Sequence, residues 1–99
     1  MHEGRGATRY NFGAIAEVID LDQSDALVSL TRDLSLSGCF VKTTTPYPEG
    51  TRVRVRIIHS GGEFVAVGNV TANVTDTGMG IAFTEIEPGD QAILERWLS

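Results

Sequence analysis

Two arginines near the start of the chain, Arg5 and Arg9, stand four residues apart. Arginine presents a planar fork of donors that matches a carboxylate, a phosphate or the edge of a guanine. The net charge of −5 argues against a general nucleic-acid binder, because DNA or RNA affinity depends on a broad basic surface. The composition therefore disfavours DNA or RNA as the partner and leaves a small charged ligand open.

A second group of polar residues interrupts an extended segment with the sequence DLSLSG. Leu34 and Leu36 alternate with Asp33 and Ser35, which is the period-two pattern of a half-buried strand. The alternation predicts that both leucines face a core and that the polar side chains share the opposite, open face. Gly38 then ends this polar face, where a β-branched residue would pack better in a strand.

Short strands with turn residues between them fill most of the chain. The clearest is the segment Thr51–His59, in which three arginines alternate with apolar residues, and Ser60-Gly61-Gly62 after it predicts a hairpin turn. Gly68 predicts a bulge within a long strand. The expected extended segments are Ala14–Leu21, Ala26–Leu36, Cys39–Thr43, Thr51–His59, Glu63–Thr75 and Met79–Ile86.

The end of the chain has helical character. Pro88 suits a first helical turn, and the apolar side chains that follow it fall on one helical face; they are Ile93, Leu94, Trp97 and Leu98. About six antiparallel strands in 99 residues favour a small closed barrel. The sequence thus predicts a mainly β fold, a small six-stranded antiparallel β-barrel with a short C-terminal α-helix.

The pattern Arg5-x-x-x-Arg9, followed after twenty-three residues by Asp33-x-Ser35-x-x-Gly38, resembles the paired signature of PilZ domains. These domains are bacterial receptors for cyclic di-GMP. The resemblance extends over nearly the whole chain, including the last strand and the C-terminal helix. It implies a flexible N-terminal arm over residues 1–12, which carries the two arginines, and a PilZ barrel domain with its helix over residues 13–99.

The resemblance also implies roles for the motif residues. Arg5 and Arg9 would engage guanine edges and phosphates, and Asp33 would accept hydrogen bonds from a guanine's Watson–Crick edge. Ser35 would lie beside Asp33. Gly38 would let the backbone come close to the ligand, where a Cβ would intrude.

Taken one at a time, these residues also fit plainer roles. Arg5 and Arg9 could be solvated surface charges, and Asp33 with Ser35 could form an exposed strand face. Catalysis is not expected, because no nucleophile–base pair and no metal-ligand spacing is visible. Cys39 lies in an apolar run that suggests a buried, inert thiol.

Two functions remain open from the sequence. The first is a cytoplasmic receptor that binds cyclic di-GMP, without enzymatic activity, cofactor or metal. It would relay the signal to an unidentified downstream protein in motility, biofilm or exopolysaccharide, or pilus control, by ordering of the N-terminal arm. The alternative is a PilZ-fold adaptor that binds proteins and no nucleotide. No membrane insertion is expected, because no apolar run approaches twenty residues.

Overall fold

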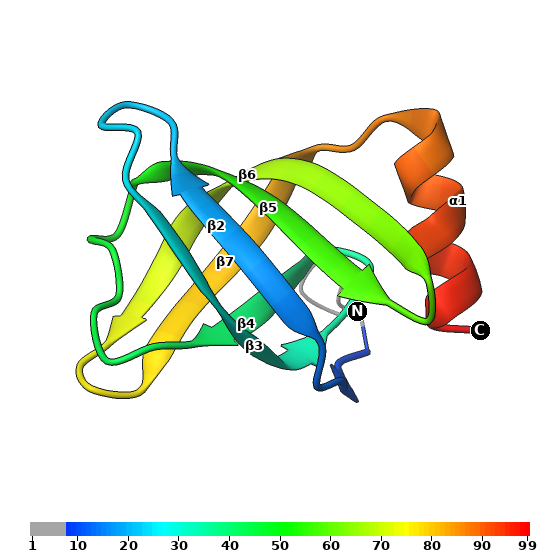
Figure 1. Cartoon of the computed structure of the whole chain (residues 1–99), viewed down its shortest axis with the longest axis horizontal. Helices are drawn as coiled ribbons and strands as arrows, with labels where there is room; N and C mark the ends of the chain where they lie inside the picture. The colour runs from blue at the N-terminus through cyan, green and yellow to red at the C-terminus, as the bar shows by residue number, and fades with distance from the viewer. Residues whose placement is uncertain (1–7) are drawn as a thin grey trace.

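Antiparallel strands form a closed barrel in the computed structural model, which describes residues 8–99. The sheet order is β1-β3-β2-β5-β6-β7-β4, and an additional pairing between β3 and β4 closes six strands, while β1 lies outside the ring (Figure 1). This confirms the predicted barrel. The elements are β1 (Tyr10–Asn11), β2 (Ile15–Asp20), β3 (Ala26–Leu34), β4 (Gly38–Lys42), β5 (Arg52–His59), β6 (Gly62–Val74), β7 (Gly78–Glu85) and α1 (Pro88–Trp97).

Strand β5 follows the alternation of its sequence. Val53, Val55 and Ile57 are fully buried in the barrel core, and the arginines between them are exposed. The turn after β5 has Ser60 and Gly61 at positive φ angles of 52° and 75°, and His59 pairs with Gly62 across it. A two-residue hairpin turn with both φ angles positive matches the right-handed twist of its strands, so the predicted hairpin is confirmed.

The sequence interpretation of the end of β3 was wrong at Leu36. Strand β3 ends at Leu34, which is fully buried, whereas Leu36 lies in the following turn and is 48% exposed. The two-residue strand β1 was not predicted. It pairs with the end of β3, Tyr10 opposite Leu34 and Asn11 opposite Asp33, so residues 10 and 11 of the proposed arm run beside the barrel.

The predicted irregularity at Gly68 is confirmed, although the extra residue belongs to the partner strand. Val67 pairs with Glu85 and Gly68 with Phe83, which leaves Thr84 of β7 as the extra residue of a bulge. A Cβ at Gly68 would collide with the carbonyl oxygen of Ala82. The barrel strands approach each other closely at this point, and only glycine leaves the necessary room.

Helix α1 lies beside one end of the barrel, next to the turn between β5 and β6 (Figure 1). Leu94 is fully buried, and the other three predicted apolar residues pack against the core. The Trp97 ring lies 5.8 Å from the Phe12 ring and 5.3 Å from the His59 ring, between centroids. Within residues 8–99, no helix has the length and apolar character needed to cross a membrane.

Candidate ligand-binding site

Arg9 and Asp33, which are twenty-four residues apart in the sequence, form an ion pair. The Nη1 atom of Arg9 lies 2.6 Å from Oδ1 of Asp33. The pairing of β1 with the end of β3 positions the two side chains, because Asn11 lies opposite Asp33. The structure therefore brings together one residue from each of the two sequence motifs. Arg5 lies outside the described residues.

A second arginine, Arg32, also holds Asp33. Its Nε donates a hydrogen bond of 3.0 Å to Oδ2, so that each carboxylate oxygen has its own guanidinium. Neighbouring residues of a regular strand point to opposite faces. Here Thr31 pairs with Val41 and Asp33 with Phe40, so Arg32 is the extra residue of a bulge. The bulge redirects the side chains and lets two adjacent residues form an ion pair.

The side chain of Ser35 stabilises the turn between β3 and β4. Its Oγ accepts hydrogen bonds from the backbone N–H groups of Ser37 and Gly38, each at 3.1 Å. The backbone N–H of Ser35 donates to the carbonyl of Gly38 at 2.8 Å. Ser35 is 1% exposed and Asp33 is 7% exposed, so the polar face is not the open surface that the alternation predicted.

Gly38 is tightly enclosed by the barrel itself. A Cβ at this position would collide with the carbonyl oxygen of Ile81, on the β7 strand that pairs with β4. The neighbour that the structure shows at Gly38 is the backbone of β7, so the barrel packing alone already requires a glycine here. The approach of a ligand to the Gly38 backbone stays a prediction.

Two guanidinium groups and one carboxylate give the described part of the site an excess of positive charge. Such a site suits an anion that also carries hydrogen-bond donors for the carboxylate.

Burial raises the pKa of the Cys39 thiol to about 12; the smaller effect of Arg9 lowers this pKa, and that of Asp33 raises it. The thiol therefore stays protonated near neutral pH and is not a nucleophile there. Among residues 8–99, no group of side chains could hold a metal ion.

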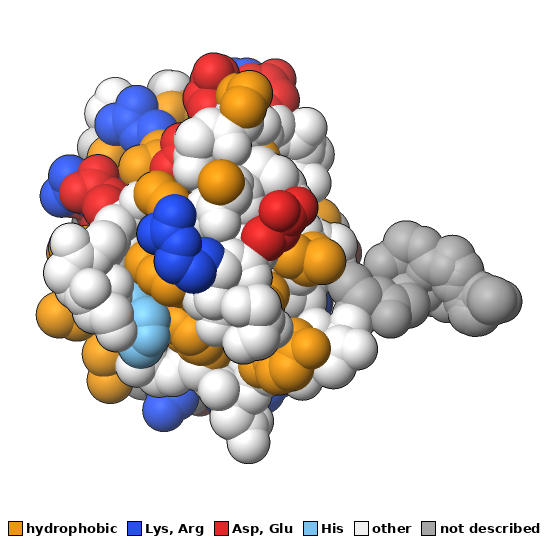
Figure 2. Space-filling model, turned by 90° about the vertical axis from the view of Figure 1, so that its right-hand side faces the viewer, with side chains coloured by type: hydrophobic (Ala, Val, Ile, Leu, Met, Phe, Trp, Pro, Cys, Tyr) orange, Lys and Arg blue, Asp and Glu red, His pale blue; other side chains and the backbone are white. Residues whose placement is uncertain are grey.

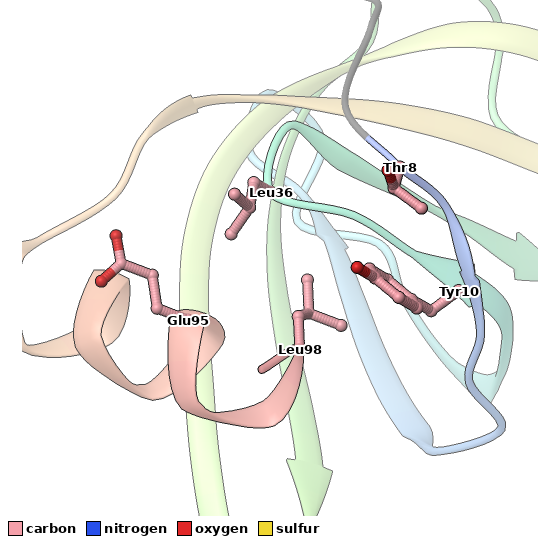
Figure 3. A pocket seen from close by; sticks show the side chains of 5 residues that line it. All are labelled: Thr8, Tyr10, Leu36, Glu95 and Leu98. Atoms are coloured by element: carbon pink, nitrogen blue, oxygen red, sulfur yellow. The ribbon is translucent and has the colours of Figure 1, made fainter.

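A hollow of about 180 Å³ lies between the segment Thr8–Tyr10, which includes Arg9, and the C-terminal end of α1. Figure 3 shows the Tyr10 ring and Leu98 on its two sides and Leu36 of the β3–β4 turn above them. Thr8 and Glu95 complete the lining. On the face that α1 covers, acidic, basic and hydrophobic side chains are interspersed (Figure 2).

Several solved structures share this fold. The PilZ domain of CeSA from a cellulose-synthesizing bacterium has a TM-score of 0.73 and 24% identity, covering 91% of this chain and 93% of that one. The PilZ domain of YcgR from Escherichia coli, solved with c-di-GMP, has a TM-score of 0.73 and 20% identity, covering 96% and 88%. The MrkH–c-di-GMP complex of K. pneumonia has a TM-score of 0.78 and 15% identity, covering 99% and 52%.

The chain thus spans about half of MrkH and nearly all of the two isolated PilZ domains. No curated protein sequence matches this chain. The family model of the PilZ domain matches residues 3–99, which include both arginines of the first motif and the whole of the barrel and helix. With this match, and with the barrel and helix that the structure shows, the chain belongs to the PilZ domain family.

Proposed function

We propose that this protein is a receptor for cyclic di-GMP without catalytic activity of its own. The observation that carries the proposal is the ion pair between Arg9 and Asp33, which joins the two motifs beside the Ser35–Gly38 turn. Cyclic di-GMP carries two phosphates and two guanines. A guanine offers O6 and N7 as acceptors for an arginine fork, and N1 and N2 as donors for a carboxylate.

The proposed binding mode exchanges protein contacts for ligand contacts. Arg9 would leave Asp33 for a guanine edge or a phosphate, and Arg5 would bind beside it. Asp33 would then accept hydrogen bonds from a guanine. The complexes of YcgR and MrkH with c-di-GMP, which share this fold, support the choice of ligand.

Calorimetric titration with cyclic di-GMP tests this function, with GTP and cyclic AMP as controls. We expect saturable heat with cyclic di-GMP alone, and an affinity that falls as salt rises because phosphate contacts are screened. The absence of heat with cyclic di-GMP at micromolar protein would contradict the proposal. It would favour the alternative function, an adaptor that binds proteins and no nucleotide.

We further propose that ligand binding orders the N-terminal arm and that a downstream protein reads the change. Tyr10 and Asn11 already pair with β3, so the proposed ordering concerns Arg9 and the residues before it. Two arginines that settle against the ligand would carry their charge to a new place on the surface. The output would be control of motility, of biofilm or exopolysaccharide, or of pili.

Backbone NMR relaxation of residues 4–9 tests the arm. We expect order parameters below about 0.6 without ligand and values near those of the barrel strands at saturation with cyclic di-GMP. Residues of β5 serve as an internal reference, because they lie within the barrel in both states. An arm that is equally rigid, or equally mobile, with and without ligand would contradict the ordering mechanism while leaving the choice of ligand intact.

A further inference from the structure

Arg32 belongs to neither sequence motif, yet its guanidinium is held by two contacts. Its Nε bonds to Oδ2 of Asp33 at 3.0 Å, and its Cζ lies 3.8 Å from the centroid of the Phe40 ring. A guanidinium this close to an aromatic face is attracted by the ring. The bulge at Arg32 places both partners within reach of one side chain.

The ring beneath Arg32 is itself fixed. Phe40 lies opposite Asp33 in the pairing of β3 with β4, and it also faces β7, because a Cβ at Gly78 would lie 2.5 Å from Cε1 of the ring. Phe40 is buried. The core-facing neighbours of Phe40 in β4 are Cys39 and Val41, so the ring packs on the outer side of the sheet against Gly78 of β7, and there it limits the positions that the guanidinium can take.

The two arginines hold Asp33 in different ways. Arg9 lies at the beginning of the described chain and joins the carboxylate through Oδ1. Arg32 belongs to a barrel strand, rests on Phe40 and joins it through Oδ2. A carboxylate can accept about four hydrogen bonds, two at each oxygen, so Oδ2 can accept one from Arg32 and one from a guanine at the same time. When Arg9 leaves for the ligand, the contact with Arg32 can remain.

We infer that Arg32 is a positioning residue for guanine recognition: supported by Phe40, it aims the Asp33 carboxylate at the N1 and N2 donors of the bound base. The inference rests on the proposed function and adds a residue outside the two motifs. The side chain of Arg32 is 54% exposed, so its replacement changes few packing contacts. Its effect on ligand binding can thus be measured in folded protein.

The variant Arg32→Lys keeps the charge and removes the planar group and the Nε donor. We expect it to weaken cyclic di-GMP binding by tenfold or more in calorimetric titration, with a thermal midpoint within a few degrees of the wild type. Arg54→Lys is the matched control. Arg54 is an exposed arginine on β5, which pairs with neither β3 nor β4, and this variant should bind within twofold of the wild type.

The same substitution in an Asp33→Asn background separates positioning from general attraction. If Arg32 acts through the carboxylate, Arg32→Lys should cost less than threefold once the carboxylate is gone. An equal loss in both backgrounds, or binding by Arg32→Lys within twofold of the wild type, would overturn the inference and leave the proposed function standing. Wild-type protein that gives no heat with cyclic di-GMP would instead remove the proposed function itself, and the inference with it.

Discussion

Gly38→Ala is expected to destabilise the barrel by about 3 kcal/mol, which corresponds to a fall in the thermal midpoint of roughly 10–20 °C. The methyl group would collide with the carbonyl oxygen of Ile81, which is backbone and cannot rotate away. Strands β4 and β7 are paired along five residues from Gly38 to Lys42, so the clash has to be relieved by moving a strand of the barrel. Thermal and urea denaturation followed by circular dichroism measure the loss.

Gly13→Ala is the control for this substitution. A Cβ at Gly13 has no neighbour within 4 Å, so this variant should match or slightly exceed the wild type in stability. If Gly38→Ala were as stable as Gly13→Ala, the close approach to β7 would not be what requires the glycine. If it then also lost cyclic di-GMP binding, a ligand contact would be the reason for the glycine, as the sequence first suggested.

Asp33→Ala is expected to weaken cyclic di-GMP binding by about 2–3 kcal/mol, or roughly 30- to 150-fold. This is the upper part of the range for a bidentate contact with a base. The change removes the acceptor for the guanine donors. It also leaves Arg9 and Arg32 without the carboxylate that each of them contacts. The cost in stability should stay below about 1 kcal/mol, because both arginines are half-exposed and can turn to water. Titration and thermal denaturation of the same preparation separate the two effects.

Asp33→Asn should be milder, because the amide keeps the shape of the side chain and one acceptor oxygen. Asp25→Ala, which removes an exposed acid from the turn before β3, serves as the control for net charge and should bind like the wild type. Equal, negligible effects of both Asp33 variants would mean that this carboxylate has no part in binding.

The barrel could be predicted because its signals are local. In β5 the buried and exposed residues alternate as the sequence does, and Ser60-Gly61 has the turn conformation that its residues favour. Gly68 is a local signal too. A glycine inside a strand weakens that strand, so it usually marks a bulge or a place where another backbone comes close. Strand β1 gave no such signal, because two residues are too few to show a period.

The site was harder to predict, because its geometry depends on departures from strand regularity. Alternation placed Leu36 in the core, but the Ser35 hydroxyl bonds to the backbone after it and turns the chain. Alternation also places Arg32 and Asp33 on opposite faces, and only the bulge brings them together. A bulge depends on the partner strand, so one strand's sequence does not reveal it. Arg32 therefore had no signal in the sequence.

The contact between Phe12 and Trp97 gives the protein a built-in optical probe. Trp97 is the single tryptophan of the chain, so all of the indole fluorescence comes from one place. Its ring stacks near Phe12, three residues after Arg9, and meets His59 edge-on. A shift of the backbone around Arg9 that carries Phe12 with it would change the surroundings of the indole. Emission from the unlabelled protein would therefore report a displacement of the arm that reaches Phe12, at concentrations far below those that NMR or calorimetry requires.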